Sequence, residues 1–252
     1  MIEIQGVTKR YGEVAVVQDV SLTLPKGGVT SIIGPNGAGK STLLSMVSRL
    51  IPMSAGTVKV DGLDITTTPG EVLARRLSIL RQESRVASRL TVRELVSFGR
   101  YPHSRGRLTE EDNAHVARAL SHMALEDIQD RFLDELSGGQ RQRAFVAMVL
   151  CQDTDYVLLD EPLNNLDLRH AVSMMKYLRR AADELSKTIV LVIHDLNFAS
   201  CYSDHIVAMR DGAVAFQGPP ERIIQPEVLK AIYGLDIRVH DLDGDRVAVY
   251  YR

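Results

Sequence analysis

The chain has 252 residues, enough for one large domain or two modest ones with a substantial buried core. Its residues are 45% hydrophobic and 25% charged, an ordinary globular composition, and its net charge of −2 gives no support for binding nucleic acid through bulk charge. The longest apolar runs, at 146–151 and 189–193, are too short to cross a bilayer. We therefore expect a cytoplasmic protein that reaches a membrane only through a partner.

The first eighty residues alternate short β-rich runs with turns. The run 57–60 alternates apolar and polar residues just before Asp61-Gly62, which is the pattern of a half-buried strand followed by a turn. Strands are predicted in this part of the chain at 2–4, 14–17, 21–24, 29–33, 57–60 and 77–80.

The segment from Gly34 to Ser41 reads GPNGAGKS and fits the phosphate-binding pattern G-x-x-x-x-G-K-[ST]. It lies between the predicted strand 29–33 and a helix predicted at 41–49. Its glycines let the backbone turn tightly and point several N–H groups at an anion. Lys40 is expected to reach the β- and γ-phosphates and Ser41 to ligate Mg²⁺. The complete pattern disfavours a glycine-rich turn that binds nothing. The nucleotide-binding candidates here are Gly34, Pro35, Asn36, Gly37, Ala38, Gly39, Lys40, Ser41 and Thr42.

Between residues 83 and 150 the pattern becomes helical. Thr91 and Glu94 have the spacing of a capping box, and Thr109 with Asp112 begins another helix that runs to about residue 123. No Pro/Gly/Ser-rich linker borders this stretch, so it is expected to be an inserted subdomain.

The segment 136–140 reads LSGGQ, and Ser137 is a good N-cap for a helix over 138–150. A serine hydroxyl, two glycine amides and a helix dipole together make a second candidate anion site. Taken alone, the segment could also be a flexible loop before an amphipathic helix.

The β/α alternation resumes after residue 150 and predicts a parallel sheet covered on both faces. The strand over 156–159 ends in Asp160 and Glu161, at the edge where such sheets bind ligands. Asp160 is the candidate Mg²⁺ ligand and Glu161 the candidate general base, the alternative being a surface pair that caps the strand. Further strands are predicted at 188–193 and 206–209, helices at 168–184 and 195–203, and hairpin turns at Asp211-Gly212 and Asp243-Gly244.

With the phosphate loop, the LSGGQ run resembles that of ATP-binding cassette (ABC) ATPases, and the resemblance extends over nearly the whole chain. It implies an α/β P-loop NTPase fold with a RecA-type parallel sheet core, an N-terminal antiparallel β subdomain and an inserted α-helical subdomain. One ABC ATPase domain would cover 1–252, and ATP is the implied nucleotide. Its parts would be a nucleotide-binding core at 1–82 and 151–215, a helical signature subdomain at 83–150 and a C-terminal extension at 216–252.

The resemblance also gives roles to single residues. His194 matches the switch histidine, which contacts the γ-phosphate and orients the catalytic glutamate, Glu161. Gln82 matches the Q-loop glutamine that senses Mg²⁺ and water, although Arg81 stands where many relatives have proline. Tyr11 matches the aromatic residue that stacks on adenine, with Val16 packing beside it.

A nucleotide-dependent homodimer is implied as well. In the family, two cassettes face head to tail, and each ATP lies between the phosphate loop of one subunit and the signature of the other. Asp167 matches the D-loop aspartate that reaches across to the second subunit, although Asn164-Asn165 depart from the family's Ser-Ala. The residues assigned to the signature are Ser137, Gly138, Gly139 and Gln140.

The segment 90–102 resembles that of cassettes serving iron–siderophore, haem and cobalamin permeases, and 163–167 and 197–204 resemble the siderophore branch. This predicts the ATPase subunit of an importer of a ferric siderophore or similar metal chelate, peripheral on the inner face of the cell membrane. Its implied partners are transmembrane permease subunits and a substrate-binding protein, and no nucleic acid. The alternatives are another ABC transport substrate, or a soluble ABC ATPase without a transport role.

Overall fold

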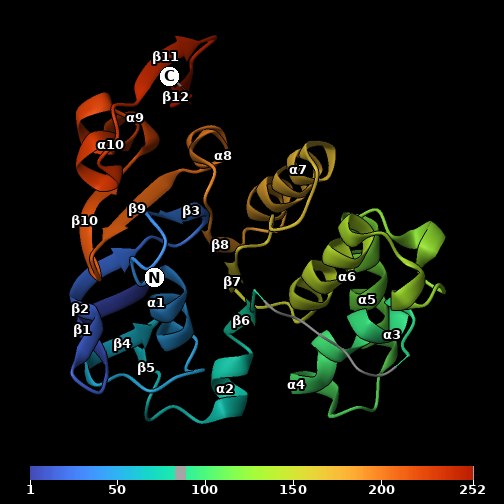
Figure 1. Ribbon diagram of the computed structural model, residues 1–252. Coiled ribbons are helices and arrows are strands. Elements are labelled where there is room, and N and C mark those ends of the chain that lie inside the picture. Colours follow the sequence, from blue (N-terminus) through green and yellow to red (C-terminus); the bar gives the residue numbers. More distant parts are fainter. Residues whose placement is uncertain (83–88, 252) are drawn as a thin grey trace. The chain divides into compact units, whose positions relative to one another are not determined.

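The computed structural model describes residues 1–82 and 89–251, which form two compact units (Figure 1). Unit 1 comprises Met1–Thr68 and Thr188–Arg252, and unit 2 comprises Pro69–Lys187. The subdomain boundaries at 82, 150 and 215 stay a prediction.

Unit 1 contains an antiparallel sheet with the strand order β2-β1-β4-β5. The strands are β1 (Ile2–Tyr11), β2 (Val14–Leu24), β4 (Ala55–Val60) and β5 (Leu63–Asp64). The prediction of separate strands at 14–17 and 21–24 is wrong, because β2 is continuous. Asp19, with φ of 45°, lies where the register of β1 and β2 shifts, and Val20 pairs with Val7 beyond it. A local β-bulge therefore keeps the polar residues within one continuous strand.

The second sheet of unit 1 has the order β10-β9-β3-β8. Its strands are β3 (Gly28–Ile33), β8 (Thr188–Val192), β9 (His205–Arg210) and β10 (Ala213–Gly218). Strand β3 runs parallel to both neighbours, and β10 returns antiparallel to β9 through the predicted turn at Asp211-Gly212. All five residues of β8 are buried, because a strand without alternation can be covered on both faces.

The helices of unit 1 are α1 (Lys40–Val47), α8 (Leu196–Tyr202), α9 (Pro220–Ile223) and α10 (Pro226–Tyr233). A C-terminal hairpin of β11 (Arg238–Leu242) and β12 (Asp245–Val249) turns at the predicted Asp243-Gly244 (Figure 1). This hairpin is tied to α8, since Ala248 donates its N–H to Asn197 Oδ1 at 2.8 Å and Asn197 Nδ2 donates to the Ala248 carbonyl at 3.4 Å.

Unit 2 contains two parallel strands, β6 (Leu77–Leu80) and β7 (Tyr156–Asp160), of which β7 is wholly buried. Capping boxes open two helices as predicted, Thr91 with Glu94 before α3 and Thr109 with Asp112 before α5. The first six residues of the predicted helical insert lie outside the described residues. The helices are α2 (Gly70–Ala74), α3 (Val92–Ser97), α4 (Tyr101–Ser104), α5 (Glu110–His122), α6 (Gly138–Cys151) and α7 (Leu168–Glu184), with short 3₁₀ turns at Phe98–Arg100, Glu126–Ile128 and Leu133–Glu135.

In the parts of the chain that the structure describes, none of the helices is both long and apolar enough to span a membrane.

Candidate functional site

The phosphate loop of unit 1 connects the end of β3 to the start of α1. Gly34 has φ of 142°, and a Cβ there would collide with the Met209 carbonyl oxygen, so only glycine fits. Gly39 has φ of 91°, and a Cβ there would lie 2.7 Å from the Val16 carbonyl oxygen. The loop therefore requires glycine at these two positions, because any side chain there would collide with a neighbouring backbone carbonyl.

Lys40 folds back over this loop. Its Nζ donates to the Gly34 carbonyl at 2.9 Å and to the Pro35 carbonyl at 3.0 Å, and the residue is only 5% exposed. Ser41 and Thr42 follow in the first turn of α1 and are half-buried. No acidic residue lies in that turn, so the positive end of the helix dipole is not offset there and favours an anion.

Tyr11 and Val16, the predicted adenine contacts, both belong to unit 1. The Val16 carbonyl packs against Gly39, so Val16 stands beside the phosphate loop. The Tyr11 ring is 55% exposed, with Lys9 Nζ 4.9 Å from its centroid, and it can therefore stack on a planar ligand.

His194 is exposed and lies just beyond β8. The Ile193 N–H donates to the Ile32 carbonyl of β3 at 3.2 Å, which holds the segment against the neighbouring parallel strand. Because β3 and β8 run parallel, their carboxyl ends meet at one edge of the sheet. Unit 1 thus brings together the phosphate loop and the predicted switch histidine.

In unit 2, Gln82 and Glu161 follow the parallel strands β6 and β7. Gln82 Nε2 donates to Glu161 Oε2 at 2.6 Å, and Asn164 Nδ2 approaches the same oxygen at 3.4 Å. Glu161 has φ of 51°, and the Asn164 N–H donates to its carbonyl at 3.1 Å, so a tight turn aims the carboxylate out of the strand. Asp160, the last residue of β7, is 8% exposed. The sequence analysis names Asn164 only as a departure within the predicted D-loop and did not predict its contact with Glu161.

The predicted magnesium ligands offer only oxygen atoms. Ser41 supplies a hydroxyl and Asp160 a carboxylate. Since the Gln82 nitrogen donates to Glu161, its amide oxygen is the atom left to bind a cation. Hydroxyl, carboxylate and amide oxygens are the donors that Mg²⁺ accepts, so these residues fit the ion.

The signature segment opens α6. Ser137 Oγ accepts from the Gln140 N–H at 3.3 Å, and Gln140 Oε1 accepts from the Ser137 N–H at 3.0 Å. This capping box confirms Ser137 as the N-cap. Ser137 and Gly138 are exposed, and a Cβ at Gly138 would meet nothing within 4 Å, so this helix end is open to a ligand.

His170 links two predicted site segments, and sequence reasoning gave it no role. Asp167 caps α7 and accepts from the His170 ring nitrogen Nδ1 at 2.7 Å. The same imidazole fills the space where a Gly139 Cβ would stand. Hydrogen bonds from the His170 backbone and ring lower the pKa of Asp167. The predicted D-loop and the signature are therefore in contact through one side chain.

Comparison with known proteins identifies the family of the chain. The pattern of the family described as "ABC transporter" matches residues 17–164. The chain belongs to this family, as an ATP-hydrolysing ATP-binding subunit, and the predicted α/β cassette fold is confirmed.

Among its relatives, the Bacillus subtilis petrobactin import ATP-binding protein YclP is 55% identical over 251 residues, covering 100% of both chains. The ferric enterobactin transport ATP-binding protein FepC of Escherichia coli is 40% identical, covering 94% of this chain and 88% of that protein. Among solved structures, a post-hydrolysis dimer of the cassette MJ0796 with ADP and Pi has a TM-score of 0.77 at 27% identity, covering 87% of this chain and 99% of that one.

Proposed function

We propose that this chain hydrolyses ATP to drive the import of a ferric siderophore, or a similar metal chelate, through separate membrane permease subunits. The observation that carries the proposal is the 55% identity, over the whole length, to a protein named for petrobactin import. The likeness to a ferric enterobactin transport protein supports the wider class of iron chelates.

The nucleotide chemistry is assigned residue by residue. Lys40 and the N–H groups of the phosphate loop hold the β- and γ-phosphates, and Tyr11 stacks on adenine beside Val16. The Lys40 ammonium donates hydrogen bonds to two loop carbonyls and therefore lies within the loop. Mg²⁺, held by Ser41, Asp160 and Gln82, would neutralise charge on the phosphate oxygens.

Glu161 acts as the general base that polarises the attacking water, a role that contributes roughly 10²- to 10⁴-fold in rate. The hydrogen bond from Gln82 supports this, because it holds one carboxylate oxygen in a defined position. His194 contacts the γ-phosphate and orients the glutamate.

ATP is proposed to join two copies of the chain. The exposed Ser137 hydroxyl and Gly138 amide at the start of α6 form a second anion site, which would receive the γ-phosphate held by the partner subunit's phosphate loop. Asp167 would reach the second subunit. Because only the triphosphate bridges both anion sites, its cleavage removes the contact that favours the closed pair.

The partners follow from this role. We expect permease subunits that bind the chain at the inner face of the cell membrane, and a substrate-binding protein that delivers the chelate. The alternatives are another transported substrate and a soluble ABC ATPase.

Uptake of ⁵⁵Fe-labelled siderophores by cells lacking the chain tests the proposal. Wild-type chain should restore uptake, and Glu161→Gln should not. Restored uptake of a different labelled substrate would favour another transport role. Failure of the chain to co-purify with any multi-span membrane protein would favour the soluble alternative.

A further inference from the structure

The start of α7 contacts the signature through one side chain, that of His170, and all of these residues belong to unit 2. Asp167 is the N-cap of α7, and its Oδ1 accepts from the His170 N–H at 2.8 Å. Helical side chains lean toward the N-terminal end of their own helix, so the imidazole of this third helical residue returns toward the cap. The ring therefore lies between the predicted D-loop and the start of α6.

The first contact is a hydrogen bond from the ring. His170 Nδ1 lies 2.7 Å from Asp167 Oδ1, and because a carboxylate only accepts, the proton of this bond is on Nδ1. The hydrogen bonds from the His170 backbone and then from its ring lower the pKa of Asp167, so the carboxylate is ionised at neutral pH. The Asp167 side chain is 65% exposed, and a second subunit can therefore reach it.

The second contact is the packing of the same ring on the signature. A Cβ at Gly139 would collide with His170 Cδ2 and lie 2.6 Å from Cγ, so no side chain fits there. Gly139 lies within α6 and outside the left-handed region, so the imidazole, and not the backbone conformation, requires glycine. Gly138 differs, since a Cβ there would meet nothing within 4 Å. The two glycines therefore serve different purposes: Gly138 leaves the helix end open, and Gly139 accommodates His170.

The two contacts are made by opposite sides of one rigid ring. Nδ1 and Cδ2 are both bonded to Cγ, and they lie on either side of the Cβ–Cγ bond. Asp167 contacts the Nδ1 side, and Gly139 packs against the Cδ2 side. Because the imidazole has no internal rotation, its orientation sets the spacing between the two segments.

We propose that His170 is a positioning residue that fixes the D-loop and the signature relative to each other, so that both meet the second subunit in one arrangement. This inference rests on the proposed function, in which ATP joins two copies of the chain. Without the imidazole the two segments move separately, and only a fraction of the chains holds the arrangement that the dimer requires. The apparent affinity of the dimer then falls by that fraction. ATP binding by a single chain should not change, because it uses the phosphate loop.

Sedimentation velocity of Glu161→Gln chains with Mg²⁺ and ATP measures the dissociation constant of the dimer. In this background, His170→Ala should raise that constant about 10-fold or more, the effect of losing a hydrogen bond to a charged group. His170→Phe keeps a ring but has no donor, so its dimer should be as weak. His170→Asn can place its amide nitrogen and oxygen where Nδ1 and Cδ2 lie, and should stay within about threefold of the parent. Lys176→Ala, at an exposed position of α7, is the matched control and should change nothing.

Two measurements distinguish positioning from a purely structural effect. Titration of single chains with a fluorescent ATP analogue should give the same affinity for His170→Ala as for its parent. In chains that keep Glu161, His170→Ala should lower the ATPase rate per chain at low protein concentration, and the rate should recover as more protein drives dimerisation. The His170 N–H still caps α7 in every variant, so the chains are expected to fold, and thermal melts verify this.

The packing on the signature is tested separately. Gly139→Ala should lower the melting temperature of the nucleotide-free chain, and the same change in a His170→Ala chain should not, because the missing ring leaves room for the methyl group. Equal losses in the two backgrounds would show that the ring does not restrict this position, and would overturn the proposed link to the signature.

Three dimerisation results would also overturn the inference: a His170→Ala dimer as tight as the Lys176→Ala dimer, a His170→Phe dimer tighter than the His170→Asn dimer, or a loss of single-chain ATP binding as large as the loss of dimer. Absence of an ATP-driven dimer in the Glu161→Gln parent itself would refute the ATP-joined pair of the proposed function, and the inference with it. A normal parent dimer that His170→Ala leaves unchanged would refute the inference alone.

Discussion

Gln82 donates a hydrogen bond to the carboxylate of Glu161 across 2.6 Å, and this joins the residues that follow two parallel strands. The contact fixes one oxygen of the proposed base, while Asn164 approaches the same oxygen at 3.4 Å. Two side-chain amides therefore position the Glu161 carboxylate, and the contact from Gln82 is the shorter of the two. Both amides belong to unit 2. Gln82 lies 79 positions before Glu161 in the sequence, and Asn164 lies three positions after it.

The first prediction concerns this pair of amides. Gln82→Ala should lower kcat for ATP hydrolysis about 10-fold or more, because it releases the base and removes a proposed Mg²⁺ ligand; the effect on ATP affinity should be smaller, because the phosphate loop is unchanged. Asn164→Ala is the matched control and should lower kcat less, since the contact of Asn164 with Glu161 is longer. Steady-state kinetics of both variants measure the difference. Equal losses in the two variants would show that the 2.6 Å contact has no special role.

The second prediction concerns Lys40. Replacing it by alanine should weaken ATP binding about 10- to 150-fold, the value of a lost hydrogen bond to a charged group, roughly 1.5–3 kcal/mol. Calorimetry measures the affinity. Lys59→Ala, on strand β4, is the matched control. Because Lys40 also bonds the Gly34 and Pro35 carbonyls, a thermal melt separates lost affinity from lost folding. Unaltered ATP binding in a folded Lys40→Ala chain would refute the phosphate-loop assignment.

The third prediction is a pH dependence of stability. Arg100 Nε lies 2.8 Å from Asp112 Oδ1, and both side chains are buried. The Thr109 backbone N–H, and then the Arg100 guanidinium, lower the pKa of Asp112 from 3.8 to about 2. Because the folded-state pKa is the lower one, the carboxylate stabilises the fold fully above about pH 4, and this contribution is lost as the pH falls through about 2.

Asp112→Asn should therefore lower the free energy of unfolding by about 3–5 kcal/mol at neutral pH, since it leaves a buried guanidinium without its charge partner. The deficit against wild type should shrink as the pH approaches 2. Urea unfolding across this range measures it, with exposed Asp134→Asn as the control. A deficit that is the same at pH 7 and pH 2 would contradict the assignment.

The fourth prediction concerns the C-terminal hairpin. Asn197→Ala removes both side-chain hydrogen bonds to Ala248, each contributing about 1 kcal/mol. The amide protons of β11 and β12 should then exchange several-fold faster with deuterium, while β3 keeps its protection. Ser200→Ala, on the same helix, should leave the hairpin unchanged. Unchanged exchange in the Asn197 variant would show that other contacts hold the hairpin.

Sequence patterns predicted those parts of the fold that depend on local chemistry. Caps such as Thr91, Thr109 and Ser137 were predicted correctly because a cap bonds within its own first turn. Apolar runs such as 156–159 located the buried strands. The break expected within β2 was wrong because pairing with β1 depends on the partner strand, which local polarity does not report.

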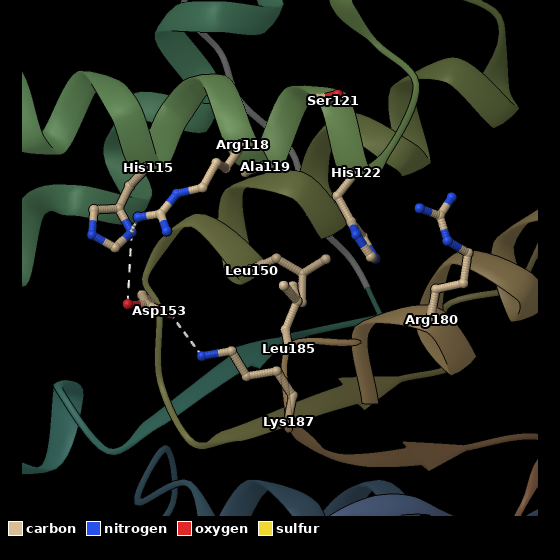
Figure 2. Close-up of a pocket in the computed structure, with 10 residues that line it drawn as sticks. All are labelled: His115, Arg118, Ala119, Ser121, His122, Leu150, Asp153, Arg180, Leu185 and Lys187. Atoms are coloured by element: carbon tan, nitrogen blue, oxygen red, sulfur yellow. Dashed lines mark hydrogen bonds and ion pairs between the residues drawn. The ribbon is translucent and has the colours of Figure 1, made fainter. Parts of the chain in front are cut away.

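The unforeseen parts of the site arise from tertiary contacts. His170 packs on Gly139 only because α7 and α6 approach each other, and no spacing in the sequence encodes this. The Gln82–Glu161 hydrogen bond joins segments that are 79 residues apart. A cavity in unit 2 likewise gathers residues from α5, from the turn after α6 and from the end of α7, which lie far apart in the sequence (Figure 2).

In the proposed mechanism, ATP joins two copies of this chain, and hydrolysis that depends on Glu161 separates them. Light scattering of purified Glu161→Gln with Mg²⁺ and ATP measures this directly. We predict twice the mass of one chain with ATP, the mass of one chain with ADP, and no detectable ATP turnover. A Glu161→Gln chain that stays monomeric with ATP, even beside its permease, would refute ATP-dependent dimerisation, and one that hydrolyses ATP at the wild-type rate would refute Glu161 as the base.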